Sequence, residues 1–166
     1  MDDAQLLIDR LHLLPHPEGG FFNEIYRSSE MISHDSLPDR YNSIRNFSTS
    51  IYFLLVKNQI SHFHRLRSDE IWHFYKGSPV VIHCLNSNGY FSVRIGANIG
   101  NDEKPQHVIP AGTWFAAEVE DKNFFSLVGC TVSPGFDFTD FELAKQSELV
   151  ELFPNQRELI LKFAKE

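Results

Sequence analysis

The stretch that decides the fold spans residues 61–77 and reads SHFHRLRSDEIWHFYKG. Its aromatic side chains favour a β-strand. Successive side chains of a strand point to opposite faces, so His62 and His64 are expected to share one face. If the strand lines a barrel, both imidazoles point inward. Together with the carboxylate of Glu70 they would form a set of the type that binds Fe, Mn, Ni, Cu or Zn. The stretch therefore predicts polar side chains inside a small-molecule pocket.

The region around this stretch has the pattern of an antiparallel all-β domain. Short apolar runs, rich in aromatic and β-branched residues, alternate with turn-forming residues. The clearest hairpin signal is Asn88-Gly89, between Val80–Leu85 and Tyr90–Ile95. It predicts a type I′ turn, which needs positive φ at both central positions. Residues 96–105 are predicted to form a longer surface loop. We predict a barrel or sandwich of about eight to ten strands.

Helical spacing flanks the β region on both sides. Asp3 is placed to cap a helix from about Ala4 to Leu14, in which leucine and isoleucine recur every three or four residues. Apolar residues return to this spacing after Glu142, with a break at Pro154-Asn155. The sequence therefore predicts one helix before the β region and a helical pair after it.

The composition indicates a single domain. The chain has 166 residues, of which 42% are hydrophobic, and its 15 phenylalanines can supply a sizeable core. We place the whole domain at residues 1–166. Its barrel core covers about residues 20–141, and its C-terminal helical segment covers about residues 142–166.

The same composition limits the compartment and the partners. Neither a basic leader region nor a run of roughly 20 apolar residues is present, which predicts a soluble cytoplasmic protein with no membrane partner. Cys84 and Cys130 lie in apolar runs and are predicted to be buried free thiols, as suits a reducing compartment. The formal charge of −7 comes without a long basic cluster, which argues against nucleic acid as a partner. Edge strands of an open sheet favour pairing with a second copy, so we predict a homodimer.

The spacing in residues 61–77 resembles the first motif of the cupin superfamily. In that motif a His-x-His pair is followed after three or four residues by Glu, and after six more by Gly. Glu70 and Gly77 fit the second half. If His62 and His64 are the pair, five residues precede Glu70. If His64 is the first member, Leu66 stands at the second histidine position. Both registers remain open.

The second cupin motif, Pro-x-Gly-x-x-His, is matched by residues 110–115 up to its final position. There the chain has Phe115, which cannot bind a metal. The resemblance therefore implies a cavity without a metal or other cofactor. The alternative is a metal-dependent site in which His62, His64 and Glu70 are the ligands.

A larger set of segments resembles a branch of small cupins that are named only as domains of unknown function. The resemblance covers about residues 15–142. It implies an all-β, RmlC-like jelly roll, also called a double-stranded β-helix, that forms dimers and has been likened to metal-free sugar-nucleotide epimerases. The segments are His16-Pro17-Glu18-Gly19-Gly20, Glu24-Ile25-Tyr26-Arg27-Ser28, residues 63–65, residues 68–75, Pro110-Ala111-Gly112 and residues 128–138.

In those epimerases a histidine held by an acid removes a proton beside a carbonyl, and a tyrosine returns one from the opposite face. On this chain the resemblance implies His64 as the base, paired with Glu70, and Tyr52 or Tyr75 as the acid. A buried glutamate among aromatic residues also has a raised pKa unless it is paired, which suits acid–base work.

Other side chains are candidates for binding the ligand. Trp72 and Phe74 share the Glu70 face by alternation and can form a stacking wall for a planar ligand or fill the core. Phe115 and His62 belong to the same predicted pocket. Arg27 and Arg65 can clamp a carboxylate or phosphate, or can lie at a solvated edge. The further candidates for the pocket are therefore His62, Trp72, Phe74, Phe115, Arg27 and Arg65.

Three functions are compatible with this sequence. The first is a metal-independent, epimerase- or isomerase-like enzyme that transfers protons on a sugar-like or carbonyl-containing metabolite. The second is a non-catalytic protein that binds a small metabolite. The third is a metal-dependent oxygenase or isomerase. The sequence does not identify the ligand.

Overall fold

The computed structural model describes residues 3–166. Three helices are present in this range, α1 (Asp3–Arg10), α2 (Gln146–Leu152) and α3 (Arg157–Phe163). The strands are β1 (Leu14–Pro15), β2 (Phe21–Arg27), β3 (Met31–Ile32), β4 (Arg45–Asn46), β5 (Thr49–Val56), β6 (Ile60–Leu66), β7 (Asp69–Gly77), β8 (Val80–Asn86), β9 (Gly89–Ile95), β10 (Gln106–Ile109), β11 (Trp114–Val119), β12 (Phe125–Ser133) and β13 (Phe141–Leu143).

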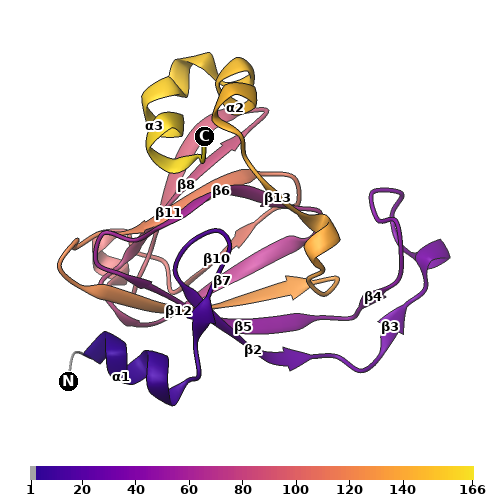
Figure 1. Ribbon diagram of the computed structural model, residues 1–166, viewed down its shortest axis with the longest axis horizontal. Coiled ribbons are helices and arrows are strands. Elements are labelled where there is room, and N and C mark those ends of the chain that lie inside the picture. The colour runs from indigo at the N-terminus through magenta and orange to yellow at the C-terminus, as the bar shows by residue number, and fades with distance from the viewer. Residues whose placement is uncertain (1–2) are drawn as a thin grey trace.

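Two antiparallel sheets face each other and form a jelly roll. One sheet has the strand order β1-β2-β5-β12-β7-β10, and the other has the order β13-β6-β11-β8-β9. Figure 1 shows α1 beside the first sheet and the pair α2 and α3 beyond the second. The segment that carries β3 and β4 projects from the barrel. The predicted all-β, double-stranded β-helix fold with a short N-terminal helix and C-terminal helices is confirmed.

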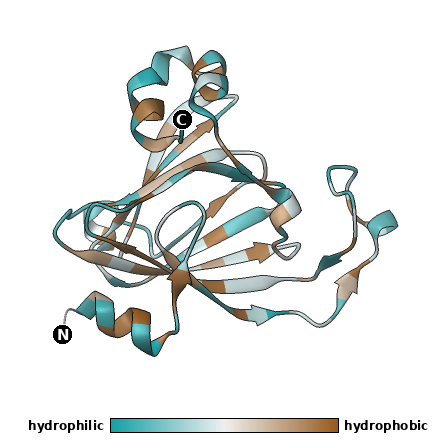
Figure 2. Cartoon of the chain, viewed as in Figure 1, coloured by the Kyte–Doolittle hydropathy of each residue, from teal (hydrophilic) through white to brown (hydrophobic). Residues whose placement is uncertain are grey.

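Apolar side chains fill three spaces between these layers, and Figure 2 shows how hydrophobic and hydrophilic residues alternate along the elements. The central cluster lies between the sheets and includes Phe53, Trp72 and Phe115. A second cluster joins α2 and α3 to the outer face of β6 and β11, and a third joins α1 to the outer face of β5 and β12. Cys84 and Cys130 are buried free thiols, as predicted. Within residues 3–166, no helix has the length and apolarity needed to cross a bilayer.

The side chains of strand β6 do not alternate regularly between its two faces at His62 and His64, the histidines of the predicted motif. Its register against β11 shifts between Ser61 and His64, so that two residues of β6 lie opposite one residue of β11. The extra residue of such a bulge reverses the faces on either side of it. His64 consequently points into the barrel, whereas His62 places Nδ1 3.1 Å from the carbonyl oxygen of Phe163 in α3. The expectation that His62 and His64 share the inner face is therefore wrong.

Two element boundaries and one turn type differ from the sequence predictions. Helix α1 ends at Arg10 rather than near Leu14, because Leu14 pairs with β2 and His12 adopts a positive φ of 53°. Strand β13 delays the first C-terminal helix until Gln146. The predicted β8–β9 hairpin is confirmed. Its turn is not type I′. That turn needs a positive φ at both central residues, whereas among residues 86–89 only Gly89 has a positive φ, of 98°.

Candidate active site

A cavity of about 290 Å³ lies inside the jelly roll. Its walls are rich in phenylalanine, with Phe22, Phe53, Phe136, Phe138 and Phe141 contributing. Several titratable side chains also line it, and we call two glutamates and two histidines among them the acid–histidine cluster: His16, Glu18, His64 and Glu70. Pockets of this kind, with apolar walls and a few convergent polar groups, are typical small-molecule sites.

The turn before β2 brings Glu18 into the cavity. The N–H of Gly19 donates to the carbonyl of His16 at 3.0 Å, and the N–H of His16 donates to the carbonyl of Gly20 at 3.0 Å. Gly19 has a φ of 110°, and a Cβ at this position would collide with the carbonyl oxygen of Ile60. Glycine is therefore required here. This tight turn is fixed against β6, where the N–H of His62 donates to the carbonyl of Glu18 at 2.7 Å.

Glu18 is the hub of the acid–histidine cluster. Its Oε2 lies 3.2 Å from Nε2 of His64 and 3.4 Å from Nδ1 of His16. Its Oε1 accepts a hydrogen bond of 2.8 Å from the hydroxyl of Ser61. Because of the bulge in β6, Ser61 and His64 both point inward and can reach the same carboxyl group.

The 3.2 Å separation of His64 Nε2 from Glu18 Oε2 lets one proton lie between the two groups. Nδ1 of His64 lies 2.7 Å from the carbonyl oxygen of His62, and since a carbonyl oxygen only accepts, Nδ1 carries a proton. A neutral His64 then presents an unprotonated Nε2 to Glu18. The short contact consequently needs a proton on either Nε2 or the carboxyl group. Burial raises the pKa of Glu18 and lowers the pKa of His64, which favours the neutral carboxylic acid and neutral imidazole.

Glu70 is the second acid of the cluster and lies on β7, where it is 7% exposed. Its Oε2 accepts a hydrogen bond of 2.9 Å from the indole N–H of Trp72. Within residues 3–166 no hydrogen bond reaches Oε1. Burial, and then the nearby Glu18, raises the pKa of Glu70 to about 7, although His64 and Trp72 act in the opposite direction. Glu70 can therefore gain or lose a proton near neutral pH.

The geometry selects one of the two motif registers. His64, Leu66 and Glu70 all line the cavity, whereas His62 does not. The register in which Leu66 stands at the second histidine position is therefore the one that the fold adopts. An apolar side chain then occupies a place where the motif has a ligand.

The three ligands of the alternative, metal-dependent site do not come together. His62 is turned toward α3, and the ring of Phe115 lies 4.1 Å from the ring of His64. The part of the chain that the structure describes contains no group of three or more His, Cys, Asp or Glu side chains arranged to hold a metal ion. The residues present therefore do not fit a centre built from His62, His64 and Glu70.

The predicted stacking wall is also corrected. Trp72 and Phe115 are each 1% exposed and belong to the central core, where the ring of Trp72 packs edge-on against Phe53 and Phe115. Phe74 packs against the same core. These rings support His64 and Glu70 from behind. The cavity walls come instead from phenylalanines on β2, β5 and the segment leading into β13.

Neither tyrosine that was considered as an acid lies in the cavity. Tyr52 packs with the residues under α1, on the outer face of β5. Its ring meets that of Tyr75 at 6.0 Å, and Tyr75 is 48% exposed. Ile51 and Phe53, the neighbours of Tyr52 in sequence, line the cavity instead, because strand alternation turns Tyr52 outward.

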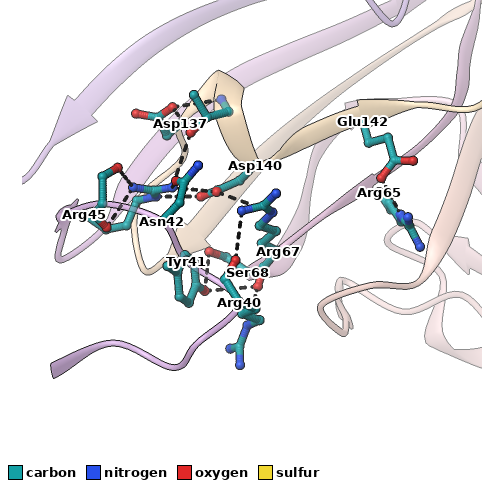
Figure 3. Close-up of polar contacts among 12 residues, drawn as sticks. Arg40, Tyr41, Asn42, Arg45, Arg65, Arg67, Ser68, Asp137, Asp140 and Glu142 are labelled. Atoms are coloured by element: carbon teal, nitrogen blue, oxygen red, sulfur yellow. Dashed lines mark hydrogen bonds and ion pairs between the residues drawn. The ribbon is translucent and has the colours of Figure 1, made fainter. Parts of the chain in front are cut away.

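The two candidate arginine clamps have different positions. Arg27 lines the cavity, but its guanidinium makes two hydrogen bonds to Glu24, at 2.8 and 2.7 Å, and contacts Asn46 and the carbonyl of Phe136. Arg65 lies outside the cavity and is paired with Glu142 at 2.8 Å (Figure 3). Arg65 is thus not a group of this cavity, which corrects the prediction.

Sequence reasoning assigned no role to His16 or Glu18. The only signal was that both residues belong to a segment of the family resemblance, His16-Pro17-Glu18-Gly19-Gly20. Only the folded turn reveals that Glu18 contacts His64, from a position 46 residues earlier in the chain. Spacing along β6 and β7 could not find that contact.

Residues 5–144 match the family described as Cupin superfamily (DUF985). The chain is 30% identical over 171 residues to the uncharacterized protein YML079W of Saccharomyces cerevisiae, across 96% of this chain and 84% of the yeast protein. It is similar to the solved structure of protein SO0799 from Shewanella oneidensis, with 37% identity, a TM-score of 0.87 and 99% of each chain covered. It is also similar to a hypothetical protein from Leishmania major, with 34% identity, a TM-score of 0.88 and coverage of 98% and 99%.

Proposed function

The chain belongs to the DUF985 family of the cupin superfamily, and we propose that its cavity catalyses proton transfer next to the carbonyl group of a small metabolite. The observation that carries this proposal is Glu70. It is a buried carboxyl group with a pKa of about 7, and one of its oxygens is left for a ligand. A second proton carrier, the Glu18–His64 contact, lines the same cavity. Acid and base placed together in this way are typical of isomerases.

The proposed step uses both proton carriers. The substrate is an α-hydroxy carbonyl compound. The carboxylate of Glu70 removes a proton from the hydroxyl-bearing carbon next to the carbonyl, and the electrons of that C–H bond form a C=C bond. The carbonyl π electrons move to oxygen, which takes the proton shared by Glu18 and His64. Glu70 then returns its proton to the former carbonyl carbon, while the neighbouring hydroxyl proton passes back to the Glu18–His64 contact. The product is an isomer of the substrate, and no oxidant or reductant is consumed.

The positions of the tyrosines favour isomerisation over epimerisation. Inversion at one carbon by two residues needs an acid on the face opposite the base. Tyr52 and Tyr75 were the candidates for that acid, and both lie on the outer side of the sheet. A single carboxyl group that removes and returns a proton on one face suffices for a keto–aldo isomerisation.

The test is exchange of carbon-bound hydrogen in D₂O, followed by proton NMR with dihydroxyacetone as the probe. The wild-type protein is expected to speed the exchange at pH 7, and Glu70→Gln to lower the catalysed rate about 100-fold or more. Tyr52→Phe is the control and is expected to leave the rate unchanged. Equal rates for wild type and Glu70→Gln would contradict the proposal. No exchange above the buffer rate would contradict it as well and would favour the non-catalytic binding protein.

A further inference from the structure

The charges around the cavity are unbalanced. Four carboxyl groups line it, from Glu18, Glu24, Glu70 and Asp137, against one arginine, Arg27. The two hydrogen bonds from Arg27 to Glu24 pair those two charges with each other. Asp137 accepts hydrogen bonds from the hydroxyl and the N–H of Thr139, at 2.6 and 2.8 Å. These bonds, together with the nearby charges of Arg45 and Arg27, lower its pKa and keep it ionised.

The buried residue Glu70 lines the cavity and keeps one carboxyl oxygen free of hydrogen bonds from the described residues. Glu70 is only 7% exposed, and its Oε1 has no hydrogen-bond partner in the described part of the chain. A carboxylate oxygen in a low-dielectric site is costly when unpaired. A ligand that carries both a proton donor and a positive charge satisfies this oxygen better than a neutral donor does.

The aromatic walls of the cavity also favour a positively charged ligand. The faces of aromatic rings attract cations through their quadrupoles, and five phenylalanines line the cavity. An anion would be disfavoured in the same cavity. It would be buried beside the carboxyl group of Glu70, and Arg27, the sole arginine among the described lining residues, is already paired with Glu24.

We propose that the ligand of this cavity is a small protonated amine with an apolar or uncharged body, and that phosphates and carboxylates are rejected. The inference rests on the proposed function in one respect, since it narrows the substrate to an amino-carbonyl compound without a phosphate group. The volume of about 290 Å³ limits the ligand to a small molecule. A sugar nucleotide with its diphosphate does not match these charges.

The test uses three probes of nearly the same shape and different charge: 2-phenylethylamine, 2-phenylethanol and phenylacetate. Binding is measured by isothermal titration calorimetry at pH 7.5 and low salt. The amine is expected to bind at least about tenfold more tightly than the alcohol, and phenylacetate most weakly. Asp137→Asn is expected to weaken amine binding severalfold and to leave alcohol binding unchanged. Glu142→Gln, which removes an exposed carboxylate outside the cavity, is the matched control and should change neither.

Three results would overturn the inference: equal binding of amine and alcohol, tightest binding of phenylacetate, or no binding of any probe. The exchange of dihydroxyacetone separates this inference from the proposed function. If Glu70→Gln lowers the exchange rate but the amine binds no more tightly than the alcohol, the proposed proton transfer stands and only the proposed ligand class is wrong. If the amine is preferred while Glu70→Gln leaves exchange unchanged, the ligand class stands and proton transfer is wrong.

Discussion

Two buried carboxyl groups of this protein, Asp140 and Glu70, are equally hidden from solvent and very differently bonded. Asp140 is 5% exposed and Glu70 is 7% exposed. Both oxygens of Asp140 accept hydrogen bonds of 2.6 Å from Arg45. The remaining N–H groups of Arg45 reach neighbours that include Asn42 (Figure 3). Glu70 receives one N–H, from Trp72.

Burial alone therefore does not mark a functional acid. Asp140 has a full set of donors, and its pairing with Arg45 ties the segment beside the cavity wall to β4. Glu70 keeps one oxygen without a partner in the described residues, and its pKa rises to about 7. A satisfied carboxylate stabilises the fold, whereas an unsatisfied one is available for chemistry.

The largest expected effect comes from breaking the satisfied pair. Asp140→Ala leaves the guanidinium of Arg45 buried without its carboxylate. The free energy of unfolding in urea is expected to fall by about 3 kcal/mol. Glu142→Ala, which breaks the exposed pair with Arg65, is the control and should cost less than about 1 kcal/mol. Similar losses in the two variants would mean that the Arg45–Asp140 pair is not especially stabilising.

A smaller effect is expected from Glu70→Gln, and it depends on pH. The pKa of Glu70 rises from 4.5 to about 7 on folding, so the folded state binds more protons between these values. The stabilising contribution is present below pH 4.5 and is lost as the pH rises through 7. The loss amounts to at most about 3 kcal/mol. Glutamine stays neutral, so Glu70→Gln should remove this part of the pH dependence and be relatively more stable above pH 7.

The measurement is urea unfolding of wild type and variant from pH 4 to 8. The groups that face Glu70 are Glu18, His64 and Cys130, and all three remain in both proteins. The pKa of His64 is lowered, so its contribution is lost as the pH falls and runs in the opposite direction. The difference between the two curves therefore reports Glu70 together with its electrostatic coupling to His64 and Cys130. Parallel curves across this range would show that its pKa is not raised.

The smallest effect distinguishes two fully buried serines. Ser61 donates to Glu18 at 2.8 Å, whereas the hydroxyl oxygen of Ser126 has no hydrogen-bond partner among residues 3–166. Ser61→Ala is expected to cost about 1 kcal/mol in unfolding free energy. It should also raise the pKa of Glu18 further, because the lost bond favours the carboxylate. Ser126→Ala should be neutral or slightly stabilising. Equal losses in the two variants would remove the role given to Ser61.

Much of the fold could be predicted because it depends on local pattern. Alternating apolar runs and turn residues indicated the jelly roll, and helical spacing placed the terminal helices. The errors occurred where tertiary contacts override that pattern. Helix α1 stops early because Leu14 pairs with β2, and the hairpin turn follows the positive φ of Gly89 instead of a type I′ geometry.

The candidate site was predicted less well. His64 and Glu70 do line one cavity, as the spacing on two strands suggested. The bulge in β6 removes His62 from it, and a bulge leaves no clear signal in a single sequence. Trp72 and Phe115 are core residues. Strand alternation predicts which face of the sheet a side chain lies on, but not whether it lines a cavity there or is covered by other side chains.

The sequence by itself determined the β architecture, the family and the presence of a polar pair inside the barrel. These follow from periodicity and motif spacing, which are properties of neighbouring residues. Only the tertiary structure decided that Glu18 contacts His64, that the tyrosines face away from the cavity, and that Glu70 keeps a raised pKa. Those properties depend on burial and on contacts between distant segments, and a linear spacing contains neither.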